Sequence, residues 1–168
     1  MKTRRLCCSL VMVLLCSDVS AAEVSGALGV WLRTVAGPHM VELLGNHPRF
    51  KGEPVRIMAM KGGQPIEATD QLTDQIRTEL THRLLAETDV RIPLSPRGGC
   101  RSAGVYSVLG VELVPDGNRH AVTVAMLDVD EGIWINGSLV KWSGRLDRGQ
   151  KNLARRTIRR VSSVFAVD

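Results

Sequence analysis

The chain has 168 residues, which is room for one domain of ordinary size and not for two. Hydrophobic residues make up 44% of it, enough for a core, and 22 Lys and Arg against 17 Asp and Glu give a formal charge of +5. This mild positive charge suits contact with an acidic protein or with an anionic cell-wall or lipid surface, but it does not require such a partner.

The N-terminus has the three parts of a secretory signal peptide. Lys2, Arg4 and Arg5 form a positive start, an apolar stretch follows from Leu6 to Cys16, and Val19-Ser20-Ala21 has the small residues of a cleavage site. The apolar stretch is about half as long as a helix that spans a bilayer, so it does not predict a transmembrane anchor. We therefore expect residues 1–21 to be a signal peptide and residues 22–168 to form one domain. The mature protein is expected in the periplasm, either free or associated with the outer membrane.

Cys16 offers an alternative, a lipid anchor on an acylated mature N-terminus. Lipoprotein signal peptidases require a small residue directly before the cysteine, and Leu15 is large, so cleavage after Ala21 is preferred. That cleavage leaves 19 basic against 16 acidic residues and removes every cysteine except Cys100. With one cysteine no intramolecular disulfide can form, and the core alone must stabilise the domain.

The domain begins with a predicted helix and a predicted strand. Apolar spacing indicates a helix over residues 24–46, and Gly37-Pro38 predicts a kink or two short helices because proline lacks an amide donor. Residues 54–60 alternate with largely apolar side chains on both sides, which predicts an interior strand.

The clearest helix runs from a cap at Thr69 or Asp70 to about Glu87. Its apolar residues keep helical spacing: Leu72, Ile76, Leu80, Leu84 and Leu85. Val90 and Ile92 then predict a short strand. A strand, a helix and a second strand in this order indicate a βαβ unit with parallel strands.

Beyond an exposed loop at Ser95–Ser102 the apolar period becomes two. Turn sequences that contain glycine separate three runs, 104–114, 120–129 and 133–142, which predicts an antiparallel meander. Residues 150–165 predict a terminal amphipathic helix. The expected fold is therefore α/β (α+β), with one mixed sheet built from the βαβ unit and the meander, and with flanking N- and C-terminal helices.

Four arginines on the predicted terminal helix are the strongest surface feature: Arg155, Arg156, Arg159 and Arg160. On a helix they form a basic stripe opposite the apolar side. Such a stripe either keeps the helix in water, where the helix dipole favours cations near the C-terminus, or docks onto an acidic partner, lipid headgroups or cell-wall polymer. Nucleic acid is not the expected partner, because export separates the protein from it and only 4% of the residues are aromatic.

Trp134 and Trp142 are eight residues apart in the third strand run, so they share a face of the sheet unless a bulge intervenes. Gly137 is a candidate position for a bulge. Core packing is the preferred role for both tryptophans, and a paired aromatic surface is the alternative.

Catalytic and metal chemistry find little support. Cys100 is the single candidate nucleophile of the mature chain, and a cysteine hydrolase needs a histidine close to the thiol. Supporting local chemistry and metal-ligand spacing are both missing around the four histidines: His39, His47, His82 and His120. Asp128, Asp130 and Glu131 mark a strand end and a turn more simply than a calcium site. We expect no catalytic residue, no metal and no cofactor.

The order of elements resembles a group of envelope proteins, and three stretches carry the resemblance: Pro54–Met60, Tyr106–Leu113 and Val122–Gly132. The group includes the N-terminal domain of the translocation protein TolB, the curli secretion protein CsgG, and the outer-membrane lipoprotein activators of penicillin-binding proteins. In that group a strand that reaches a glycine, a polar turn, and a strand that ends in Asp before Gly recur. The resemblance covers about residues 53–145 and departs at the Trp134–Trp142 segment. It implies a binding or assembly module and transfers no functional residue.

The sequence thus predicts a non-catalytic accessory or assembly protein of the bacterial cell envelope that works by protein–protein docking. Two alternatives stay open. One is a cysteine-dependent hydrolase that uses Cys100, and the other is a nucleic-acid-associated protein of a conjugative element.

Overall fold

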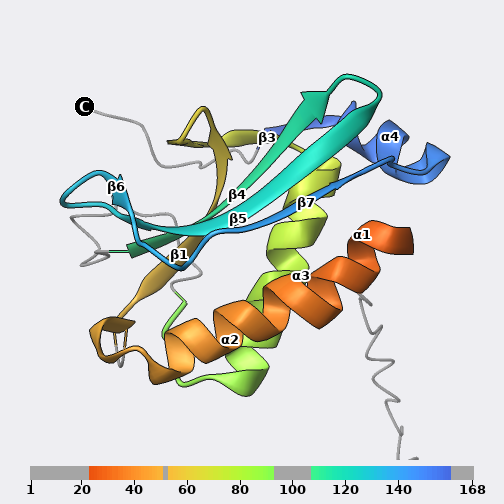
Figure 1. The fold of residues 1–168 in the computed structure, drawn as a ribbon. Coiled ribbons are helices and arrows are strands. Elements are labelled where there is room, and N and C mark those ends of the chain that lie inside the picture. Colours follow the sequence, from red (N-terminus) through yellow and green to blue (C-terminus); the bar gives the residue numbers. More distant parts are fainter. Residues whose placement is uncertain (1–22, 51–52, 93–106, 160–168) are drawn as a thin grey trace, which may run out of the picture.

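The structure is a computed structural model, and it describes residues 23–50, 53–92 and 107–159. A curled mixed sheet lies against helices on one of its faces, with a short two-stranded sheet and a last helix near one end (Figure 1). This architecture confirms the predicted α/β fold class. The predicted signal peptide, Cys16, the Ser95–Ser102 loop and Cys100 lie outside the described residues. Within the described ranges, no helix is both long and apolar enough to cross a membrane.

One nearly continuous helical run opens the described chain. It consists of α1 (Gly26–Trp31), a π-helical segment η1 (Leu32–Ala36) and α2 (Gly37–Asn46). At Gly37-Pro38 the sequence predicts a kink or two short helices. The structure has a local widening of the helix there instead, in which the Gly37 N–H donates to the Leu32 carbonyl, five residues earlier.

The widening explains how this run keeps one face in the core. Buried side chains recur at every fourth residue: Leu28, Leu32, Ala36, Met40 and Leu44. A four-residue repeat drifts around an α-helix of about 3.6 residues per turn. The π segment holds more residues per turn and offsets that drift, so the five side chains form a single stripe.

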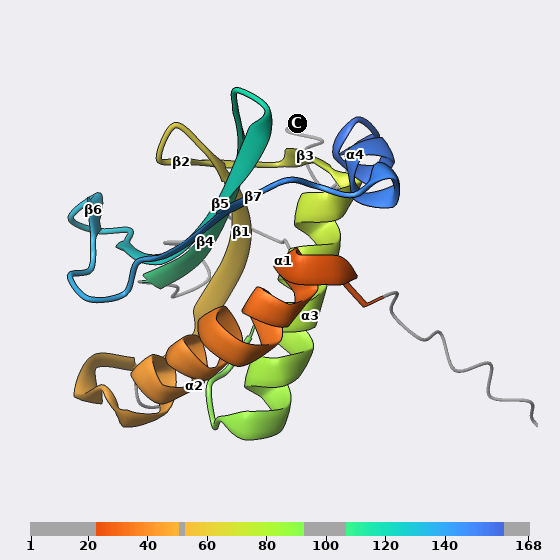
Figure 2. The same ribbon diagram turned by 45° about the vertical axis from the view of Figure 1, so that its right-hand side comes forward.

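The largest sheet is built around the predicted interior strand. β1 (Val55–Lys61) pairs antiparallel with β2 (Gln64–Ile66) on one side and parallel with β4 (Ser107–Asp116) on the other. We call the face of this sheet that the helices cover the inner face, and the opposite one the outer face (Figure 2). The inner face carries most of the core, whereas the outer face holds a small cluster of Met60, Val108 and Leu127.

The predicted central helix is confirmed as α3 (Gln71–Glu87), which follows the short strand β3 (Ala68–Asp70). Of the two predicted caps the structure uses Asp70, whose carboxylate accepts the Thr73 N–H at 2.8 Å. Four side chains of the predicted stripe are buried: Leu72, Ile76, Leu80 and Leu84. The prediction that Leu85 belongs to this stripe is wrong, because it lies about 100° around the helix from its neighbour and is 48% exposed.

The βαβ unit exists, but its second strand comes later in the chain than predicted. At the predicted strand 90–92 only Arg91 pairs, in a single parallel bridge with Pro54. Pro93 follows in the sequence, and a proline cannot donate to a ladder. The parallel partner of β1 is instead β4, so the unit is β1–α3–β4.

The antiparallel half begins with the predicted hairpin of β4 and β5 (Arg119–Asp128), which turns at Gly117 with φ +56°. The third predicted strand is divided in two. Both β6 (Ile133–Trp134) and β7 (Val140–Gly144) pair with β5.

A bulge between β6 and β7 causes the division. Ser138 is buried, and its hydroxyl accepts the Met126 N–H at 2.9 Å and donates to the Ile135 carbonyl at 2.6 Å. The hydroxyl therefore replaces a ladder partner where the strand leaves β5. Gly137 has φ +78° at the bulge, and its carbonyl oxygen lies 3.0 Å from His39 Nε2 on α2.

The predicted terminal helix over 150–165 is wrong in its extent. The observed helix α4 covers Arg148–Ala154, and the chain then turns and pairs as β8 (Thr157–Arg159) with β3, antiparallel. The Gln71 N–H donates to the Arg156 carbonyl at 2.9 Å and fastens this turn to the start of α3. Two β-branched residues at the start of β8 and an available strand edge thus override the helical spacing of the apolar side chains.

Candidate docking surface around α4

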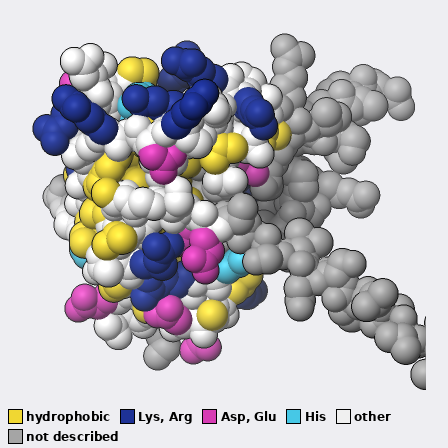
Figure 3. Space-filling view, turned by 90° about the vertical axis from the view of Figure 1, so that its right-hand side faces the viewer, with side chains coloured by type: hydrophobic (Ala, Val, Ile, Leu, Met, Phe, Trp, Pro, Cys, Tyr) yellow, Lys and Arg dark blue, Asp and Glu magenta, His cyan; other side chains and the backbone are white. Residues whose placement is uncertain are grey.

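Six exposed cations surround α4. They come from the β4–β5 turn, the end of β7, α4 itself and the turn after it: Arg119, Arg145, Arg148, Lys151, Arg155 and Arg156. We call this set the α4 basic surface. Strand register brings its parts together, because His120 pairs with Gly144 and the residues next to them, Arg119 and Arg145, flank the same end of the sheet. Figure 3 shows Lys and Arg side chains gathered over the end of the molecule that holds α4.

Asp147 is the single acidic residue between Val140 and Arg156, and its side chain is used to begin α4. The carboxylate accepts the Gln150 N–H at 2.8 Å, and the Gln150 side chain accepts the Asp147 N–H at 3.0 Å. The other carboxylate oxygen accepts the Ser25 hydroxyl at 3.1 Å. These bonds hold α4 against the start of α1. Because the Asp147 carboxylate is used in them, it is not available to pair with the surrounding cations.

None of the six cations forms an ion pair within the part of the chain that the structure describes. Elsewhere the protein does pair its cations. Arg33 lies 3.5 Å from Glu79, and Arg83 lies 3.0 Å from Glu87. Uncompensated positive charge therefore concentrates around α4, where it attracts anionic groups.

The predicted stripe of four arginines on one helical face does not form. Arg155 and Arg156 are exposed at the end of α4 and belong to the α4 basic surface. Arg159 lies in β8, and Arg160 lies outside the described residues. Sequence reasoning missed the other four members because it looked for a helical period. The signal that could have found Arg145, Arg148 and Lys151 is density, because residues 141–160 hold eight Lys and Arg and one acidic residue.

Trp134 and Trp142 lie on opposite faces of the sheet. Trp134 pairs with Leu127 and Trp142 with Val122, five positions apart in β5, so the two rings point to different sides. The alternative of a paired aromatic surface is therefore wrong. Trp142 is half-buried against the inner core, where its ring comes within 2.3 Å of the place where a Cβ on Gly144 would lie. Trp134 lies on the outer face and is 36% exposed.

Asp128 is a buried carboxylate at the end of β5. It accepts backbone N–H groups from Asp130 at 2.9 Å and from Glu131 at 3.2 Å, and it forms an ion pair with Arg49. Burial alone raises the pKa of Asp128, but Arg49 and the two N–H donors lower it by more, so the pKa lies below its ordinary value. The strand end and turn are thus confirmed. Within the described ranges, no group of three or more His, Cys, Asp and Glu is placed to hold a metal ion.

Comparison with known proteins gives a distant structural likeness. No protein-family model matches the chain, and no curated protein matches it. Among solved structures, the chain is similar to the C-terminal domain of LpoB from Salmonella enterica, with a TM-score of 0.42 and 12% identity over 68% of this chain and 98% of that one. The resemblances to TolB and CsgG stay predictions.

Proposed function

We propose that the protein is an exported, non-catalytic accessory protein of the bacterial cell envelope that docks onto an acidic protein partner through the α4 basic surface. The observation that carries this proposal is the set of six exposed cations without an acidic partner among the described residues. Such a concentration of charge steers a partner of opposite charge and fixes its orientation.

Export rests on the tripartite N-terminus, with cleavage after Ala21. The mature domain would then begin shortly before Val24, whose N–H donates to Glu79 at 3.0 Å and whose side chain is 1% exposed.

Charge removal on the surface tests the docking role. The triple variant Arg145→Gln, Arg148→Gln and Lys151→Gln should lose most of the partner that crosslinking captures from intact envelopes. Its free energy of unfolding should stay within about 0.5 kcal/mol of the wild type, because exposed unpaired charges contribute little to stability. Capture by the wild type should also fall with added salt, since exposed charges are screened over roughly 8 Å at physiological ionic strength.

Two single variants separate a local effect from an effect of net charge. Arg148→Gln and Lys61→Gln each remove one exposed cation, the first inside the α4 basic surface and the second at the end of β1. The first should weaken capture and the second should not. Equal capture by both single variants and by the triple variant would refute the docking surface.

Mass analysis tests the export half of the proposal separately. Protein from a native envelope fraction should begin at Ala22. An acylated Cys16 would convert the protein to a lipoprotein, and a mature chain that keeps residues 1–21 would refute cleavage.

A further inference from the structure

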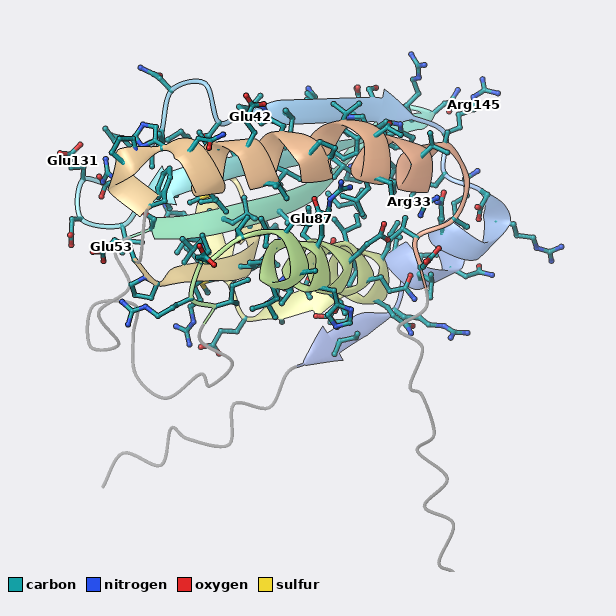
Figure 4. The ribbon with its side chains drawn as sticks, turned by 90° about the horizontal axis from the view of Figure 1, so that it is seen from below. Arg33, Glu42, Glu53, Glu87, Glu131 and Arg145 are labelled. Atoms are coloured by element: carbon teal, nitrogen blue, oxygen red, sulfur yellow. The ribbon has the colours of Figure 1, made fainter. Side chains whose placement is uncertain are left out.

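One edge of the large sheet is formed by β7. It pairs with β5 along its whole length and with no other strand that the structure describes. Figure 4 shows β7 outermost, beyond the α1–α2 run that packs on the inner face, with Arg145 labelled at its end. An open edge of this kind presents backbone donors and acceptors to another strand.

The hydrogen bonds of β5 show which backbone groups are used. Met126 directs its N–H to the Ser138 hydroxyl, and its carbonyl accepts the Ile135 N–H at 2.8 Å. Both groups thus point away from β4. Backbone direction alternates along a strand, so Val124 and Val122 point the same way, toward β7.

The β7 partners of these two residues are Val140 and Trp142, which therefore use their N–H and C=O groups in the ladder with β5. The residues between and beyond them alternate. Lys141 and Ser143 direct their N–H and C=O groups away from β5, to the open edge. Both residues are exposed, and neither side chain has a hydrogen-bond or ion-pair partner among the described residues.

The side chains beside this edge carry one sign of charge. Lys141 and Ser143 pair with Thr123 and Ala121, so they stand on the outer face, and Arg145 continues the same alternation one residue beyond β7. On the inner side the edge is apolar, because Trp142 stands there. An added strand would thus meet two cations four residues apart on one face and an indole ring on the other.

We propose that β7 accepts an extended segment of the protein partner as an additional strand, with acidic side chains of that segment opposite Lys141 and Arg145. This inference rests on the proposed function and names the form that the acidic partner takes. Main-chain hydrogen bonds to Lys141 and Ser143 would supply affinity, and the alternation of acidic and apolar side chains would supply specificity.

A second copy of the chain fits this edge poorly. Two β7 strands side by side would bring Lys141, Arg145 and the neighbouring Arg119 and Arg148 of both copies into one ribbon. Like charges at this distance repel each other. An acidic segment would instead form attractive ion pairs with the same cations.

A synthetic peptide of alternating Val and Ser, with two Glu four residues apart on the Ser face, is the probe. It should bind the full-length protein in calorimetry more tightly than a peptide with Gln in place of Glu. It should also bind more tightly than one with the two Glu five residues apart, which places them on opposite faces. The double variant Lys141→Gln and Arg145→Gln should abolish the preference for Glu over Gln.

Ser143→Pro is the decisive variant. It removes the N–H at the open edge and none of the groups that bond β5, and proline is tolerated at such edge positions. It should weaken peptide binding roughly tenfold, whereas Ser143→Ala, which keeps the N–H, should leave it unchanged. Thermal unfolding of both variants shows whether either has lost the fold.

Amide hydrogen exchange gives a direct readout in the wild type. The amides of Lys141 and Ser143 should exchange fast in the free protein and slowly with peptide, while those of Val140 and Trp142 should be slow in both states. Absence of peptide binding, unchanged exchange at Lys141 and Ser143, or full binding by Ser143→Pro would each overturn the added strand. If one of these occurs while the triple variant of the α4 basic surface still loses capture, the proposed function stands and only the strand is refuted.

Discussion

Replacing Gly29 with Ala should displace Val24 and so detach the N-terminal end of the domain from its contacts. A Cβ at Gly29 would lie 1.8 Å from the Val24 carbonyl oxygen and 2.7 Å from the Val24 carbonyl carbon. These are backbone atoms, so no side-chain rotation can relieve the overlap, and Val24 must leave its place. Val24 is 1% exposed, its N–H donates to Glu79 at 3.0 Å, and its carbonyl accepts Arg33 at 3.1 Å.

The magnitude follows from these contacts. Exposing a buried valine costs about 1.5–3 kcal/mol, and losing two hydrogen bonds costs about 0.5–1.5 kcal/mol each. Alanine returns about 1 kcal/mol through its higher helix propensity. The free energy of unfolding should therefore fall by roughly 1.5–5 kcal/mol.

Urea unfolding followed by tryptophan fluorescence measures this loss, and Gly45→Ala is the matched control. Gly45 lies in α2 of the same helical run, and a Cβ added there would meet no other part of the protein within 4 Å. Gly45→Ala should therefore raise stability by up to about 1 kcal/mol. A loss below about 1 kcal/mol for Gly29→Ala, or equal effects of the two substitutions, would refute the close packing of Val24 on Gly29.

Two further predictions concern the core and the buried carboxylate. Leu80→Ala should cost about 2–5 kcal/mol in urea unfolding because Leu80 is 1% exposed. Leu85→Ala is the control and should cost well under that, because Leu85 is 48% exposed. A loss below about 1 kcal/mol for Leu80→Ala would contradict the burial of this face of α3. Because the pKa of Asp128 is lowered in the folded state, the unfolded chain takes up this proton at a higher pH than the folded chain as pH falls. The carboxylate therefore contributes its full stability above its unfolded pKa and loses that contribution as pH falls through the folded pKa. Between neutral pH and about pH 3, Asp128→Asn should therefore lose less stability than the wild type, and parallel pH profiles would contradict the role of the Arg49 pair.

Local sequence signals predicted the parts of the fold that local physics determines. The stripe of α3 follows from helical spacing, its cap at Thr69 or Asp70 from the preference of short polar side chains for N-terminal amides, and the β4–β5 turn from glycine at positive φ. Each of these depends on residues close together in the chain. None needed knowledge of a distant partner.

The predictions that failed depend on partners far away in sequence. Apolar spacing extends the predicted terminal helix to residue 165, but β3 lies next to Thr157–Arg159 and pairs with it. No signal within residues 150–165 reveals that strand edge. The predicted basic stripe failed with the helix. Arg155 and Arg156 instead belong to the α4 basic surface, together with Arg119 and Arg145, which the register of β5 with β7 brings to the same end of the sheet.

The bulge before β7 decides which residues the candidate surface can use. Between β6 and β7 the register on β5 shifts by three residues, since Trp134 pairs with Leu127 and Trp142 with Val122. An odd shift exchanges the two faces. Without it Trp142 would stand on the outer face, and Lys141 would point toward the helices, where a charge is costly to bury. The buried Ser138 hydroxyl stabilises the shifted register by satisfying the Met126 N–H, so a small polar residue in the bulge determines that the cations beside β7 face solvent.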